Sequence, residues 1–342
     1  MGRVLKFNRV KREKVLFDMI KKLFIKIFYE WKWICAYRTI DKNDKTLPRP
    51  EKKYKYNLID MPRGYWAADP FVYQKDGNID IFFELFDINK RKAFLGHKRL
   101  NKREKKIDII YEFEGHTSYP CIFDFEGTLY IIPETKADEQ LVLLECVGYP
   151  DKWIKKSVLM SKTNTVDSTP VKLSGKYKIF LYEENTLNIK VSTLSLGELD
   201  IKNGKVCNVV PIINYSKSIG RPAGNIIVDN DKMFRVTQLG IKHYGEGLSF
   251  LEFKYDNGLF VEQEVTQLLP EQIVVDSDEK IKGVHTFNRC GNIEIIDILT
   301  VGHFSLVRPV RYFLQKFGWF GFRDNDKLHK QVYREFPVSI RY

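Results

Sequence analysis

A unit of two short apolar strands joined by a turn recurs along the chain, and this repeat limits the possible folds most strongly. Its first copy reads "ADPFVYQKDGNIDIFFE": an acid, an apolar strand, a DG turn and a second strand that ends in another acid. The opening positions of the five copies are 69, 119, 167, 221 and 285, so the steps are 50, 48, 54 and 64 residues. Paired strands at such a period are typical of propeller blades. The sequence therefore predicts an all-β fold, a five-bladed β-propeller; the alternative is a β-sandwich with similarly spaced hairpins.

Residues 11–34 show a helical pattern instead. Lysines recur there at three- and four-residue steps, opposite a face of aliphatic and aromatic residues. We expect a basic amphipathic helix that either lies on an anionic membrane surface or packs on the main domain. The predicted division is 1–53, helix and linker, and 54–342, the propeller with an aromatic C-terminal segment, "FLQKFGWFGF". That segment would form a second surface contact or close the last blade.

Charge and cysteine content limit the possible partners and the cellular location of the protein. The formal net charge is +12, which suggests an anionic partner, but no nucleic-acid-reading motif occurs and we expect no nucleic acid. Five scattered cysteines without a CxxC favour neither a disulfide framework nor a zinc site. No signal peptide or long apolar run is evident. We therefore expect a cytoplasmic protein, peripheral on the inner face of the membrane.

Polar residues mark both ends of the repeated hairpins. The two strands of a hairpin are antiparallel, so the start of the first and the end of the second lie at the same end of the propeller axis. The starts are Asp69, Tyr119, Asp167, Arg221 and His285, and the ends are Glu84, Glu134, Glu183 or Glu184, Gln238 and Asp297. Carboxylates that converge raise one another's pKa, and paired carboxyl groups carry out glycosyl chemistry.

Several of these motifs resemble known families. "ADPF", "HTSYP", "IIPE", "DST", "RPAG", "RVTQ" and "YG", in this order between Tyr54 and Glu262, are similar to the N-terminal propeller domain of glucosamine inositolphosphorylceramide transferases. More distantly, "WAADPFVYQKDG" and "VDSTPVKLSGK" resemble the five-bladed furanosidases of glycoside hydrolase family 43. The resemblance implies the five-bladed fold and an activity on carbohydrate.

The family-43 resemblance implies roles for two acids. Asp69 would be the general base, and Asp167 would tune pKa values and orient the substrate. The chain departs from that family at the fourth blade, where Arg221 stands in place of the acid. The acid would then be Glu134, or else Glu84 or Glu246. Alternatively the leaving group is a phosphate, which needs no strong acid and which Arg221 would stabilise.

These arguments lead to one set of expected site residues. The catalytic residues are Asp69, Asp167 and Glu134. The residues expected to contact substrate are Arg221, His116, Tyr119, Glu84, Gln238, Tyr244 and His285. The histidines lack the spacing of metal ligands, so we expect no metal, and we expect no cofactor.

The function expected from the sequence is glycosyl transfer. The partners would be a phosphate-activated sugar donor, furanosyl donors included, and a lipid-linked or surface polysaccharide acceptor at the cytoplasmic membrane face. The alternatives are a furanosidase-type glycoside hydrolase and a non-catalytic glycan-binding propeller.

Overall fold

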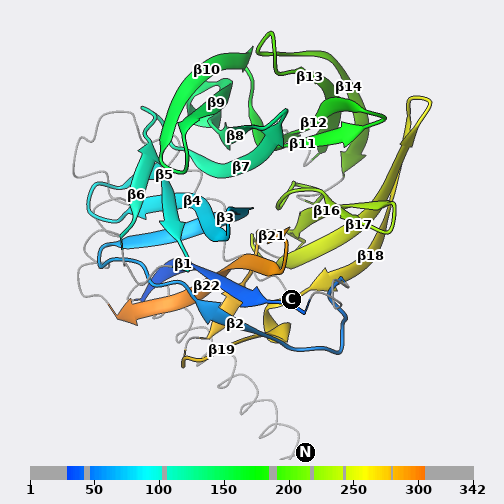
Figure 1. The fold of residues 1–342 in the computed structure, drawn as a ribbon. Helices are drawn as coiled ribbons and strands as arrows, with labels where there is room; N and C mark the ends of the chain where they lie inside the picture. The colour runs from blue at the N-terminus through cyan, green and yellow to red at the C-terminus, as the bar shows by residue number, and fades with distance from the viewer. Residues whose placement is uncertain are drawn as a thin grey trace, which may run out of the picture.

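The computed structural model describes residues 29–41, 47–101, 106–184, 191–215, 219–241, 244–278 and 280–304. Five β-sheets surround one central axis, as Figure 1 shows. The predicted all-β, five-bladed propeller is therefore confirmed. The only helices in these ranges are two short 3-10 turns, Lys136–Asp138 and Pro270–Gln272. None of the described helices is long and apolar enough to cross a membrane.

Four blades are antiparallel sheets whose strands follow one another in sequence. Blade 1 contains β3 (Tyr65–Lys75), β4 (Asn78–Asp87), β5 (Lys92–Arg99) and β6 (Asp108–Tyr111). Blade 2 contains β7 (Ser118–Phe125), β8 (Thr128–Glu134), β9 (Gln140–Gly148) and β10 (Lys152–Ser161). Blade 3 contains β11 (Thr165–Leu173), β12 (Lys176–Glu184), β13 (Ser192–Asp200) and β14 (Lys205–Tyr215). Blade 4 contains β15 (Ile227–Asp229), β16 (Lys232–Leu239), β17 (Gly247–Asp256) and β18 (Leu259–Leu268).

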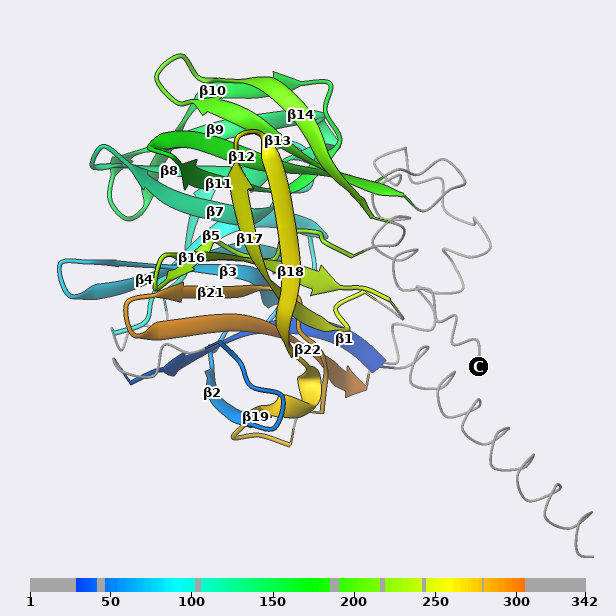
Figure 2. The ribbon, with the colours of Figure 1, turned by 90° about the vertical axis from the view of Figure 1, so that its right-hand side faces the viewer.

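Blade 5 is built from both ends of the described chain and closes the ring (Figures 1 and 2). Its later strands are β19 (Ile273–Val275), β20 (Ile281–Gly283), β21 (Phe287–Cys290) and β22 (Ile293–Phe304). Its early strands are β1 (Tyr29–Thr39) and β2 (Tyr54–Leu58). Strand β1 lies between β22 and β2 and is antiparallel to both.

This closure corrects two predictions from the sequence. Residues 29–34 are strand, so the predicted helix is wrong there, and the propeller begins at Tyr29 instead of residue 54. The physical reason is a second periodicity: aromatic and apolar residues also occupy every second position of "YEWKWICAY", which is the period of a β-strand. Cys35 and Ala36 are both fully buried. Residues 11–28 and the segment 313–322 lie outside the described residues.

The hydrophobic core is divided among the contacts between neighbouring blades. Phe71 and Phe82 of blade 1, for example, pack with Ile131 and Val142 of blade 2. Four further clusters join the remaining pairs of neighbours, including blade 5 with blade 1. Every blade thus buries both faces, and the ring holds the innermost strands at fixed positions around the axis.

The innermost strands of blades 1 to 3 share a local distortion at the predicted polar position. Asp69, Tyr119 and Asp167 have φ values of 49°, 48° and 48°, in the left-handed region that side chains other than glycine rarely adopt. Each lies in a β-bulge, where the ladder to the next strand shifts register. The repeat in the sequence therefore corresponds to a repeated β-bulge, which changes the direction of one side chain in each of these blades.

Candidate active site

Most of the polar residues predicted at the strand ends meet, together with His116, in one continuous group at the axis. We call it the axial cluster: Asp69, Glu84, His116, Glu134, Asp167, Arg221, Gln238, His285 and Asp297. The hairpin registers place its members as expected, because Ala68 is paired with Glu84 and Ser118 with Glu134. The strand ends therefore converge as expected from the repeat, while the chemical roles of these residues stay predictions.

Asp69 of blade 1 is held by groups from blades 2 and 5. Its Oδ1 accepts a hydrogen bond from Thr286 Oγ1 at 2.7 Å, and its Oδ2 accepts one from the backbone N–H of Tyr119 at 3.2 Å. Nε2 of His285 lies 3.3 Å from Oδ1. The side chain is only 8% exposed. Its carboxylate therefore has a fixed orientation, which a nucleophile or a general base requires.

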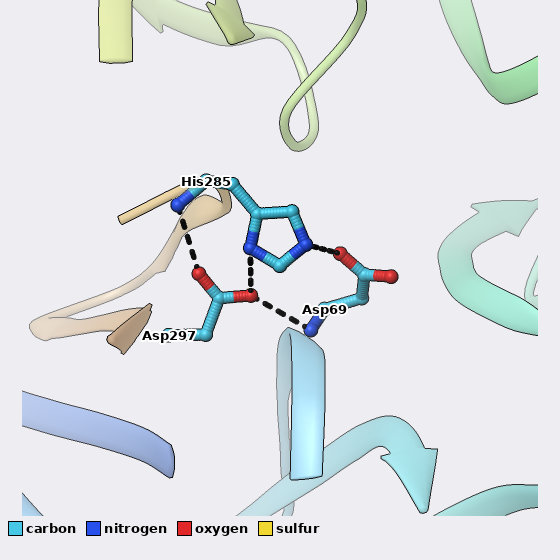
Figure 3. A group of neighbouring side chains, drawn as sticks. All are labelled: Asp69, His285 and Asp297. Carbon is cyan, nitrogen blue, oxygen red and sulfur yellow. Dashed lines mark hydrogen bonds and ion pairs between the residues drawn. The ribbon is translucent and has the colours of Figure 1, made fainter. Parts of the chain in front are cut away.

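His285 lies between two carboxylates, as Figure 3 shows. Nδ1 is 2.7 Å from Asp297 Oδ2, and Nε2 faces Asp69. Burial alone would lower the pKa of His285, but Asp297 and Asp69 together raise it above its ordinary value. Burial also raises the pKa of Asp69 to about 6, although the charge of His285 opposes this shift. The imidazole is also packed against the indole of Trp33, with ring centroids 4.0 Å apart.

Asp297 connects blade 5 to blade 1. Its Oδ1 accepts the backbone N–H groups of His285 and Thr286, each at 3.0 Å. Its Oδ2 accepts the backbone N–H of Asp69 at 2.9 Å. The sequence placed Asp297 at a strand end but gave it no role, and Trp33 was missed because a helix was expected there. Asp297 ends the second strand of its repeat, as Glu84 and Glu134 do in theirs, and this position could have identified it as a site residue.

Arg221 is surrounded by acids on the opposite side of the cluster. Its Nε lies 2.5 Å from Asp167 Oδ2, and one terminal nitrogen lies 3.1 Å from Glu134 Oε2. Its other terminal nitrogen is 3.6 Å from Glu184 Oε1. Burial would lower the pKa of this guanidinium, but Asp167 and Glu134 raise it further above its ordinary value. Gln238 donates to the same Asp167 oxygen at 3.2 Å, so the carboxylate of Asp167 has little freedom to rotate.

Two further acids have unusual electrostatics. Burial raises the pKa of Glu84 well above its usual range, and Asp69 and Glu134 add to this effect. Burial also raises the pKa of Glu134, against the opposing charge of Arg221. Carboxyl groups whose surroundings shift their pKa are the usual groups of acid–base catalysis.

Two tyrosines expected to contact substrate, Tyr244 and Tyr119, lie next to the axial cluster. Tyr244 lies beside Arg221, whose guanidinium is 5.9 Å from the centre of the tyrosine ring. Tyr119 is fully buried, and the expectation that it contacts substrate stays a prediction. Its hydroxyl is engaged by Thr169 Oγ1 at 2.8 Å and by the backbone N–H of Gly224 at 2.8 Å. A Cβ on Gly224 would lie 1.9 Å from the carbonyl oxygen of Phe287, so only glycine fits this crossing.

One group among the described residues has the spacing of a metal site, namely Asp69, His285 and Asp297. Both nitrogens of His285 already lie within ion-pair distance of a carboxylate, Nδ1 at 2.7 Å from Asp297 Oδ2 and Nε2 at 3.3 Å from Asp69 Oδ1. The expectation that the site works without a metal stays a prediction.

Comparison with known proteins decides the family. Residues 59–295 match the family described as "Glucosamine inositolphosphorylceramide transferase 1, N-terminal". The chain belongs to this family. The glucosamine inositolphosphorylceramide transferase 1 of Arabidopsis thaliana is 28% identical over 192 residues, which cover 53% of this chain and 24% of that protein. The protein of the same name from Oryza sativa subsp. indica is 26% identical over 185 residues, 51% of this chain and 24% of its own length. The chain thus spans about a quarter of the length of these transferase 1 proteins.

The chain was also compared in shape with solved glycoside hydrolases. The catalytic domain of a Coprinopsis cinerea GH62 α-L-arabinofuranosidase superposes with a TM-score of 0.52 at 11% identity, covering 81% of this chain and 98% of that domain. A thermostable family-43 glycoside hydrolase gives a TM-score of 0.48 at 11% identity, covering 70% of this chain and 92% of that one. At this identity, the arabinofuranosidase shows a common architecture only.

Proposed function

We propose that the chain is a glycosyltransferase in which the axial cluster transfers a sugar to a hydroxyl group of a glycan acceptor. The donor would be a phosphate-activated sugar, furanosyl donors included, and the acceptor a lipid-linked or surface polysaccharide. Membership of a family named for a transferase supports transfer. The observation that carries the proposal is the fixed carboxylate of Asp69, held by Thr286, Tyr119 and His285.

Asp69 would act at the anomeric carbon, as nucleophile or as base toward the acceptor hydroxyl. A pKa of about 6 leaves this carboxylate mostly ionised at neutral pH but more basic than an ordinary Asp. The surrounding carboxylates would stabilise the positive charge that develops on the sugar ring in the transition state. Asp167, held by Arg221 and Gln238, would fix the position of the sugar.

Arg221 would bind the phosphate of the donor at its most weakly held nitrogen. That nitrogen faces Glu184 at 3.6 Å, whereas Nε and the other terminal nitrogen have closer partners. Lys136 Nζ lies 3.9 Å from the second oxygen of Glu184. A phosphate that displaced Glu184 from Arg221 would therefore meet two cations side by side.

The runner-up is glycoside hydrolysis, with water in place of the acceptor. It is favoured by the number of acids in the cluster, because a neutral glycoside enters such a site without the repulsion that a phosphate meets. A glycan-binding propeller without catalysis remains the third alternative; it would bind sugars but leave them intact.

One assay separates these functions. The full chain is incubated with a panel of nucleotide sugars and aryl glycosides, each with and without oligosaccharide acceptors, and products are identified by mass spectrometry. Transfer predicts acceptor-dependent use of a nucleotide sugar, reduced about 100-fold or more in Asp69→Asn. The exposed Glu126→Gln is the matched control and should keep full activity. Turnover of aryl glycosides alone would favour hydrolysis, and glycan binding without any turnover would favour the binding module.

We also propose that the protein acts at the cytoplasmic membrane face, bound there through its basic N-terminal residues. The support is the lysine-rich pattern of residues 11–28 in the sequence. Each basic residue close to an anionic bilayer contributes about 1 kcal/mol to binding.

A further inference from the structure

Glu84 differs from the other acids of the axial cluster because one of its carboxylate oxygens is buried without a hydrogen bond. It ends the inner part of β4 opposite Ala68, and only 5% of the residue is exposed. Its Oε1 atom is buried without a hydrogen-bond partner. Nε2 of His116 is near, at 3.4 Å, but forms no hydrogen bond with that oxygen.

Four acids on neighbouring strands raise the pKa of Glu84 electrostatically: Asp69 on β3, Glu134 on β8, Asp167 on β11 and Asp297 on β22. The buried thiol of Cys35 on β1 also interacts with Glu84, and the basic group beside it is His116, at 3.4 Å. A charged carboxylate in this place would be buried, repelled by its neighbours and unpaired on one oxygen, which is costly. A neutral carboxylic acid avoids all three penalties and keeps an O–H group to donate.

Glu134, the first candidate for the acid from the sequence, has a different environment. One of its oxygens lies 3.1 Å from Arg221 and accepts a hydrogen bond from it. That contact favours the charged form of Glu134 and occupies the oxygen. Glu84 is therefore the better placed of the two to give up a proton.

We propose that Glu84 is the acid of the site and that His116 connects it to solvent. This inference rests on the proposed function. As the bond between the anomeric carbon and the leaving oxygen breaks, its electron pair stays on that oxygen, and the proton of Glu84 moves to it. Asp69 removes the proton of the acceptor hydroxyl as the new bond to the sugar forms. His116, whose side chain is 24% exposed, then passes a proton from water to Glu84, and Asp69 releases its proton to solvent.

Neutral Glu84 also reconciles an acidic site with an anionic donor. An uncharged carboxyl does not repel a phosphate, and its O–H can donate to a phosphate oxygen that Arg221 does not reach. The same residue would serve a glycoside donor, for which protonation of the leaving oxygen matters more.

The first experiment measures the proton itself and needs no substrate. The full chain is labelled with glutamate carrying carbon-13 at the carboxyl carbon, and the resonance of Glu84 is assigned as the one lost in Glu84→Gln. We expect that resonance to have the chemical shift of a protonated carboxyl at pH 7. An ionised Glu84 at pH 7 would overturn the inference.

The second experiment tests proton delivery with aryl glycosides whose phenols differ in acidity. Glu84→Gln should lose about 100-fold or more with poor leaving groups and roughly tenfold or less with nitrophenolates, which leave without a proton. An equal loss for all phenols would contradict the role of Glu84. If the wild type turns over nothing in the panel, the proposed function fails, while the carbon-13 signal still decides whether Glu84 is held protonated.

Discussion

The backbone N–H of Asp69 donates a hydrogen bond to Oδ2 of Asp297 at 2.9 Å, across a sequence separation of 228 residues. This bond joins the first blade to the last at the axis. The same carboxylate holds the backbone of His285 and Thr286, and the side chain of each of these two residues contacts the Asp69 carboxylate. The carboxylate of Asp297 therefore both closes the ring and positions Asp69, and a change at Asp297 should affect both.

Replacement of Asp297 by Asn should weaken the fold. The amide keeps the size but loses the charge that pairs with His285 and one of its hydrogen-bond acceptors. Removal of one partner of a buried ion pair costs about 3–5 kcal/mol. Urea denaturation of Asp297→Asn beside Glu126→Gln measures this loss. A free energy of unfolding within about 0.5 kcal/mol of the wild type, as expected for surface changes, would contradict the linkage.

The activity should depend on the ionisation of Asp69. Its pKa is raised to about 6, so kcat/KM should rise with pH through a midpoint near 6. The sign for stability is opposite. Because the folded pKa lies above the ordinary value of 3.8, the native state binds this proton more tightly, and the contribution of Asp69 to stability falls as pH rises from about 4 to 6.

Asp69→Asn is the control for both pH effects. The variant should lack the activity, and its stability should not show the loss between pH 4 and 6. A wild-type activity profile that is flat from pH 5 to 7 would argue that Asp69 is not the base.

His285→Gln should shift the pH profile of activity. The charge of His285 lowers the pKa of Asp69, and this charge persists because Asp297 and Asp69 raise the pKa of His285 itself. Without it, the midpoint near pH 6 should move upward by about one unit or more, as expected for the loss of a cation at 3.3 Å. Steady-state rates between pH 5 and 9 test the shift. A lower rate with an unmoved midpoint would assign His285 a purely structural role.

Arg221→Ala should destabilise the protein in a pH-dependent way. It leaves Asp167, Glu134 and Glu184 without their shared cation, and loss of one partner from a buried pair costs about 3–5 kcal/mol at neutral pH. Because acid removes the negative charges that the variant leaves without a cation, its deficit should shrink as pH falls toward about 4. Thermal unfolding at pH 7 and pH 4.5 tests this, and an equal deficit at both values would contradict it.

Much of the fold and of the cluster could be predicted from the sequence because both follow one repeat. The hairpin unit predicted five blades, and its antiparallel strands placed Asp69, Glu134 and Arg221 at one end of the axis. The contacts that individual side chains make with one another do not follow from the repeat. The repeat does not reveal that Tyr119 would turn inward and be buried, or that Arg221 would be enclosed by three acids.

The prediction failed where two periodicities overlap. Residues 29–34 fit a helical face and also alternate as a strand, and local sequence does not decide between them. Pairing with β22 decides it, since that contact gives β1 a partner along its length. A contact between residues so far apart in sequence leaves no trace in a local pattern.

Truncation at two points separates the fold from the proposed membrane contact. Deletion of residues 1–28 leaves β1 intact, so the propeller should fold and keep the stability of the full chain. Deletion of residues 1–39 removes β1 and so exposes the edges of β2 and β22 that pair with it. It also removes the buried side chains of Trp33 and Cys35 from the core. That variant should be insoluble or largely unfolded by circular dichroism. A stable 40–342 fragment would contradict the part of β1 in closing the ring.

The shorter deletion then tests membrane binding without disturbing the propeller. The full chain should sediment with vesicles containing anionic lipid, and less so as salt screens the lysines of residues 1–28. The chain without residues 1–28 should stay in the supernatant, and vesicles of neutral lipid should bind neither protein. Equal sedimentation of both proteins would place the membrane contact on the propeller itself. No sedimentation of either would remove the membrane from the proposed function and leave the chemistry of the axial cluster untouched.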